Sequence, residues 1–111
     1  MIAPVGASRF SKAMQMGAEV FYTLKKILKK RGLSTSVGDE GGFAPDLCCN
    51  SDAIELIIDA IEKAGYTTDE IKICLDVASS EFYENGRYVV GGNRYTSSEF
   101  VEVLENLVKE Y

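Results

Sequence analysis

The chain has 111 residues, of which 46% are hydrophobic and 26% are charged, with a formal net charge of −5. These values are ordinary for a globular protein, so they exclude a disordered or fibrous chain, and the length suits one domain with a modest core. The acidic charge and the lack of a basic stripe argue against nucleic acid or an anionic membrane as a partner. No apolar run approaches the ~20 residues of a membrane-spanning helix, and nothing marks the chain for secretion.

Three cysteines and the absence of histidine limit the possible metal and disulfide chemistry. Cys48 and Cys49 are adjacent and Cys74 stands apart, so there is no Cys-x-x-Cys pair. This pattern excludes the usual zinc arrangements and argues against a disulfide framework, so we expect a reduced, cytoplasmic environment. We expect the three side chains to serve as small apolar packing residues.

The first predicted elements are a short strand and a long helix. Residues 2–7 are apolar but are broken by Pro4 and Gly6, as in the end of a strand that enters a loop. Ser8 can cap a helix that ends at Gly32, and the basic residues before Gly32 suit the negative end of the helix dipole. The predicted apolar face of this helix comprises Phe10, Met14, Gly17, Phe21, Leu24 and Leu28.

The segment Val37–Pro45 places two acidic residues between glycines. The glycines let the backbone turn sharply or approach a ligand, and Pro45 fixes the direction in which the chain leaves. A phosphate loop needs Gly-Lys-Ser/Thr and a calcium loop needs regularly spaced acids, and neither pattern is present. Two interpretations remain. Either Asp39 or Glu40 holds a carboxyl group near a substrate for general acid–base work, or the segment is a tight turn whose acids cap the next helix.

A second helix and a longer strand follow. Asp52 lies in the first turn of a helix that Gly65 ends. The apolar stripe of this helix comprises Ile54, Ile57, Ile58 and Ile61. Residues 71–78 are nearly continuous in apolar residues, which is typical of a strand covered on both faces in a parallel sheet. Asp76 lies near the end of this strand, where α/β folds carry their chemistry, so it is either a metal ligand or catalytic group, or a residue bonded to loop amides.

The last elements are a hairpin and a third helix. Asn85-Gly86 between aromatic and apolar runs predicts a two-residue hairpin turn, and Thr96 with Glu99 predicts a capping box. The apolar face of the third helix comprises Phe100, Val103, Leu104, Leu107, Val108 and Tyr111. The order strand, helix, helix, strand, hairpin, helix indicates the α/β class with parallel pairing, although two core strands cannot cover three apolar helix faces.

Several segments together resemble the enolase (phosphopyruvate hydratase) family, in that family's order and spacing. They are Pro4–Ala7, Met16–Val20, Val37–Pro45, Lys63–Tyr66 and Asp76–Phe82. Gly-Asp-Glu-Gly-Gly-Phe-Ala-Pro followed by Leu-Asp-x-Ala-Ser-Ser-Glu-Phe is a specific combination, and the resemblance covers essentially all 111 residues.

The resemblance implies magnesium-dependent dehydration of 2-phosphoglycerate to phosphoenolpyruvate in glycolysis and gluconeogenesis, by a cytoplasmic homodimer. It implies a variant α/β barrel that begins strand, strand, helix, helix, with residues 1–111 as one incomplete domain, an internal fragment of the catalytic barrel. In the family a lysine base removes the C2 proton and a glutamic acid protonates the departing C3 hydroxyl. By motif match Glu40 is that acid, and Asp76 is the first Mg²⁺ carboxylate.

The other groups that the family needs are expected outside residues 1–111. They are the lysine base, the remaining magnesium acids, a second substrate lysine, a histidine and a glutamate that contact substrate, and the amino-terminal capping domain. Because such groups act as a unit, we expect the chain alone to have no meaningful dehydratase activity.

Two other interpretations compete with this one. The first is a truncated, non-catalytic enolase-like protein that acts as a binding module. The second is a stand-alone metal-binding domain, which the lack of histidine and of clustered acids disfavours. A barrel segment should expose the faces Phe10–Leu28, Ile54–Ile61 and Phe100–Tyr111 to water, whereas an evolved module should unfold cooperatively as a soluble species.

Overall fold

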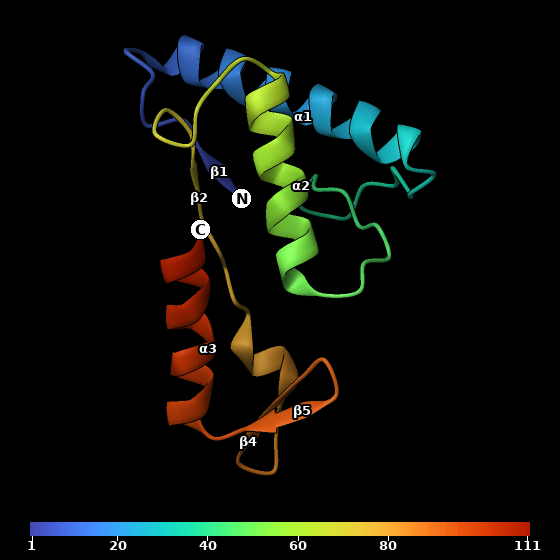
Figure 1. The fold of residues 1–111 in the computed structure, drawn as a ribbon, viewed down its shortest axis with the longest axis vertical. Coiled ribbons are helices and arrows are strands. Elements are labelled where there is room, and N and C mark those ends of the chain that lie inside the picture. The colour runs from blue at the N-terminus through green and yellow to red at the C-terminus, as the bar shows by residue number, and fades with distance from the viewer. The chain divides into compact units, whose positions relative to one another are not determined.

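A computed structural model of the chain describes residues 1–111 and divides them into two units, Met1–Leu75 and Asp76–Tyr111. The elements of the first unit are β1 (Ile2–Ala3), α1 (Phe10–Lys30), α2 (Asn50–Lys63) and β2 (Lys72–Ile73). Those of the second are η1 (Ser79–Phe82), β3 (Tyr83–Glu84), β4 (Arg87–Val90), β5 (Asn93–Tyr95) and α3 (Ser97–Glu110). This order confirms the predicted α/β class and adds one strand, β5; the strands form no closed barrel (Figure 1).

The core of the first unit forms where α1 packs on α2. Its buried members are Met16, Val20, Ile27, Leu28, Leu56, Ala60, Ile61 and Ile71. The predicted face of α1 is therefore right at its C-terminal end and wrong at its start, because Phe10 is 80% exposed and Met14 is 59% exposed. The helix buries side chains only from Met16 onward, and its first turns lie outside the core. Of the predicted face of α2, Ile54 and Ile61 are buried and Ile57 and Ile58 are half-buried, so the expectation that this face is exposed to water is wrong for its two buried members.

β1 and β2 pair antiparallel, which corrects the predicted parallel pairing. Ile2 lies opposite Ile73 and Ala3 opposite Lys72. The reason lies in the two consecutive helices between the strands. They return the chain to the edge where β1 ends, and there the amide of Gly6 donates to the carbonyl of Glu70 at 2.9 Å. From that edge β2 can only run back alongside β1.

The strand predicted over residues 71–78 is much shorter than expected. The strand itself spans only Lys72–Ile73, and Cys74 extends the pairing by one residue through backbone hydrogen bonds to and from Met1, each of 2.9 Å. Ile71 is fully buried, and Leu75 is 51% exposed. An apolar run of this kind becomes a fully buried strand only when a layer covers each face. Within the first unit β2 has one neighbouring strand, so residues 74–76 are exposed rather than buried between two layers.

The cysteines are free and exposed, so the prediction that they act as packing residues is wrong. Cys48 and Cys49 lie just before α2, whose buried positions hold larger side chains such as Leu56 and Ile61. The amide of Cys74 donates to the carbonyl of Met1 at 2.9 Å, and its side chain faces away from the core.

The second unit has an aromatic core. Asn85 and Gly86 have φ of 49° and 79°, the left-handed pair of a type I′ turn, which confirms the predicted hairpin. The ring of Phe100 on α3 stacks on Tyr88 at 4.9 Å and meets the edge of Phe82 at 5.6 Å. Of the predicted α3 face, Phe100 is buried, while Val108 at its far end is 78% exposed.

The helix ends are mostly as the sequence indicates. The capping box at α3 is confirmed, since the amide of Glu99 donates to the Thr96 hydroxyl and the Glu99 carboxylate accepts from the Thr96 amide. Gly32 and Gly65 take left-handed conformations just past their helices. The exception is α1, which begins at Phe10 after Arg9 with no side-chain cap, so Ser8 is not the cap. None of the three helices combines the length and apolar character that crossing a membrane requires.

A polar network ties α1 to the segment after α2. The Tyr66 hydroxyl donates to the Glu19 carboxylate, which also accepts from the Gln15 amide at 2.8 Å. The Lys12 ammonium lies 3.5 Å from the Tyr66 oxygen and 5.6 Å from its ring centroid. The hydrogen bond from Tyr66, reinforced by Gln15, holds the pKa of Glu19 below its usual value, and the same bond raises the pKa of Tyr66.

We predict that Tyr66→Phe removes this coupling. Because the pKa of Glu19 is lowered in the folded state, its carboxylate stabilises the fold at any pH above the ordinary value of 4.5. This stabilisation is lost as the pH falls through the lowered pKa. Because the pKa of Tyr66 is raised in the folded state, its neutral hydroxyl stabilises the fold below pH 10.0. This stabilisation is lost as the pH rises through the raised pKa. An NMR titration of Glu19 should therefore show its pKa moving up in Tyr66→Phe. Tyr22→Phe, at an exposed tyrosine of the same helix, is the control, and an unchanged Glu19 titration in Tyr66→Phe would contradict the network.

Candidate acid-bearing hairpin

The segment Val37–Pro45 folds as a miniature hairpin. Val37 and Phe43 form an isolated antiparallel bridge, and the amide of Gly38 donates to the carbonyl of Gly42 at 2.9 Å. At the tip the amide of Gly41 donates to the carbonyl of Gly38 at 3.0 Å, which closes a turn with Asp39 and Glu40 at its two corners. The sequence therefore fixes the two acids at the most projecting point of a hydrogen-bonded loop.

Gly41 is the one glycine of this hairpin that needs its special freedom. Its φ is +83°, in the left-handed region, directly after the turn. A turn followed by a left-handed residue is a common three-residue hairpin loop, and that position strongly favours glycine. A Cβ at Gly42 meets nothing within 4 Å, and its φ is negative. The glycine-rich composition thus reflects one conformational demand, at Gly41.

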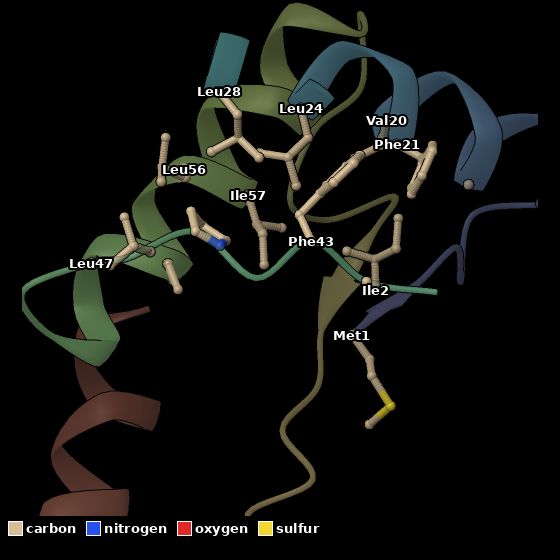
Figure 2. Close-up of a pocket in the computed structure, with 14 residues that line it drawn as sticks. Met1, Ile2, Val20, Phe21, Leu24, Leu28, Phe43, Leu47, Leu56 and Ile57 are labelled. Carbon is tan, nitrogen blue, oxygen red and sulfur yellow. The ribbon is translucent and has the colours of Figure 1, made fainter. Parts of the chain in front are cut away.

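Phe43 anchors the hairpin to the core. Its ring stacks on Phe21 of α1 with centroids 4.5 Å apart and planes 22° apart. Figure 2 shows Phe43 pointing between Phe21 and Leu24, while Leu47 lies against α2. These side chains, with Ile2 and Ile57, line an open apolar cavity of about 370 Å³ in the first unit. The sequence interpretation missed this anchor, although the aromatic residue directly after the glycines could have indicated it.

Asp39 and Glu40 are both exposed at the hairpin tip. The N-cap of α2 is Cys49, whose amide donates to the Asp52 carboxylate at 3.3 Å. The interpretation in which Asp39 or Glu40 caps the next helix is therefore wrong. The same interpretation is right about the tight turn, which holds both carboxyl groups outward, and a general acid–base role for Asp39 or Glu40 stays a prediction.

Asp76 is the first residue of the second unit, beyond the end of β2. It is exposed, and its Oδ1 accepts from the amide of Ala78 at 3.3 Å. Ala78 has a left-handed φ of 46° and stands at the start of η1. This is the loop-amide arrangement that the sequence allowed, and a carboxylate held in this way still has lone pairs available for a metal.

The chain does not by itself offer a complete magnesium site. No three acidic, cysteine or histidine side chains gather where they could hold one metal ion. Mg²⁺ prefers near-octahedral oxygen ligands, of which Asp76 supplies one carboxylate. The residues present thus fit one ligand of such a site and not the whole.

We predict that Gly41→Ala destabilises the hairpin by ~1–2 kcal/mol, because a residue with a Cβ pays that cost in the left-handed region. Gly42→Ala is the matched control, since its backbone is not left-handed and its surroundings are open. Hydrogen exchange of the Gly38 amide, which donates to Gly42, measures the effect. It should accelerate by roughly 5–30-fold in Gly41→Ala and hardly change in Gly42→Ala. Equal exchange in both variants would contradict the proposed role of Gly41.

A model of a known protein family matches the chain. The family model described as the enolase C-terminal TIM barrel domain matches residues 1–111, the full length of the chain. The matched region contains the hairpin with Glu40 and the segment that carries Asp76. Its strands and helices form an α/β fold that does not close into a barrel. The chain belongs to the enolase family, in the C-terminal barrel domain of that family.

Proposed function

We propose that this chain serves the enolase reaction, the reversible dehydration of 2-phosphoglycerate to phosphoenolpyruvate, as part of the catalytic barrel of a lyase. The observation that carries the proposal is the placement of Glu40 at the tip of a hairpin that Gly41 shapes and Phe43 anchors. Family membership over residues 1–111 supplies the reaction class.

Glu40 is proposed as the general acid. A protonated carboxyl group at the tip delivers its proton to the C3 hydroxyl, which leaves as water, and in the reverse direction the carboxylate takes a proton from water. The carboxyl group must sit within hydrogen-bond reach of the leaving oxygen in the bound state. The turn hydrogen bond and the stacked Phe43 restrict where the tip can lie, so they limit the conformational entropy lost when the acid meets substrate.

Asp76 is proposed as one carboxylate ligand of the magnesium cofactor, in keeping with the family. Its hydrogen bond from Ala78 would orient the carboxylate, as partners outside a metal's own ligands commonly do. Asp76 supplies one such ligand, and no three acidic or cysteine side chains of the chain gather into a complete site. Glycolysis and gluconeogenesis, a cytoplasmic location and a homodimeric parent enzyme are proposed on the same family grounds.

The proposed acid role predicts a loss of turnover in Glu40→Gln. In the full native gene product, kcat for dehydration should fall by ~10²–10⁴, the usual contribution of a general acid, while KM changes little. Glu62→Gln, at an exposed glutamate of α2, is the matched control and should keep the parental kcat. A Glu40→Gln enzyme with parental kcat would remove Glu40 from the mechanism.

The chain alone should show no 2-phosphoglycerate turnover above background, because no three of its acidic or cysteine side chains gather into a metal site. Metal-dependent turnover by residues 1–111 that disappears in Glu40→Gln would overturn this expectation.

The intact mass of the native gene product separates the enzyme from a non-catalytic binding module. The proposal requires a mass several times the 12.2 kDa of this chain, and a mass of 12.2 kDa would favour the module.

A further inference from the structure

Two neighbouring thiols stand at the start of α2. Cys48 and Cys49 are consecutive, and both are free and exposed. Cys49 is the N-cap residue and has an extended backbone, with φ −150° and ψ 168°, and the helix begins at Asn50. The Cys49 sulfur lies 3.0 Å from the Ser51 hydroxyl, and neither thiol packs in the core, so each can turn about χ1 without displacing a core side chain. The extended backbone directs consecutive side chains to opposite faces, so both side chains must rotate toward each other before one atom can bind both sulfurs.

The backbone disfavours a direct bond between these two sulfurs. Cα atoms of consecutive residues lie ~3.8 Å apart across a trans peptide, whereas disulfides usually join Cα atoms about 4.4–6.8 Å apart. The peptides are all trans. A single atom that bridges the two sulfurs relaxes this demand. With sulfur bonds of ~2.3 Å, as for zinc, the two sulfurs need to approach only to roughly 3.5–3.8 Å, against ~2.05 Å in a disulfide.

The number of available donors selects the kind of ligand. The chain contains no histidine, and no group of three cysteine, aspartate or glutamate side chains could hold a metal. Close to the two thiols, the Asp52 carboxylate accepts from the Cys49 amide at 3.3 Å, and the Ser51 hydroxyl lies 3.0 Å from the Cys49 sulfur. Zinc requires four ligands. Two thiols alone suit a thiophilic atom that can form only two further bonds.

We propose that Cys48 and Cys49 together bind monosubstituted trivalent arsenicals, a class of thiophilic compound with two open valences. In the reaction two sulfur–arsenic bonds form and the arsenic–oxygen double bond breaks. The oxygen leaves as water with the two thiol protons, and the oxidation state of arsenic does not change. Cys74 stands outside this site, because it follows β2 and has no neighbouring cysteine. The site does not depend on the proposed enolase function.

The test uses phenylarsine oxide and intact mass spectrometry on the reduced chain. We expect one phenylarsenic adduct per chain that survives washing with a monothiol and is released by a dithiol. Cys48→Ser and Cys49→Ser should each abolish the wash-resistant adduct, because one sulfur alone cannot close the chelate. Cys74→Ser is the matched control and should keep the adduct.

A second measurement locates the adduct without mutation. After phenylarsine oxide treatment, a thiol-alkylating reagent followed by peptide mapping should label Cys74 and leave Cys48 and Cys49 unlabelled. Circular dichroism of each variant checks that helix content is kept, as expected for substitutions at exposed residues. A wash-resistant adduct that persists in either single variant, or that is lost only in Cys74→Ser, would overturn the proposal.

Discussion

The packing of α1 on α2 is the constraint on which the rest of the first unit depends. Ala60 and Ile61 are fully buried in this contact, and Leu28 is 1% exposed. Full burial of a large apolar side chain contributes ~1.5–3 kcal/mol, whereas an aromatic pair adds ~0.5–1.5 kcal/mol beyond its buried area. The helix contact therefore contributes most of the stability of this unit, and the stack of Phe43 on Phe21 adds a smaller amount. The core sets where α1 lies, and the stack then sets where the acidic hairpin lies against α1.

Local chemistry was sufficient to predict the features that depend on a few neighbouring residues. Asn85-Gly86 defines its turn through two left-handed residues, and Thr96 with Glu99 defines the start of α3 through reciprocal hydrogen bonds. The type and order of the helices follow from apolar spacing in the same way. These elements are specified by contacts within one turn of chain, so the sequence alone suffices for them.

The features that sequence reasoning missed depend on partners distant in the chain. Phe10 and Met14 continue the spacing of the apolar face, yet they are exposed because the core begins only at Met16. The direction of β2 is set by where α2 delivers the chain, and this is a property of the helix pair rather than of residues 71–78. In the candidate site, the motif located Glu40 and Asp76, but it did not show that Phe43 anchors the hairpin by stacking on Phe21 of α1.

The hairpin fixes the position of the Glu40 carboxyl group but not its surroundings. Water reaches the tip, whereas a carboxylic acid becomes a better proton donor near neutral pH when apolar surroundings disfavour its charged form. Burying the tip within this unit would cost the desolvation of Asp39 as well as Glu40, since both occupy the same turn. In the proposed reaction, apolar surroundings for the Glu40 carboxyl group must therefore form when substrate and metal bind. On that account the hairpin positions the acid before substrate binds. The electrostatic environment that tunes the acid exists only in the assembled site.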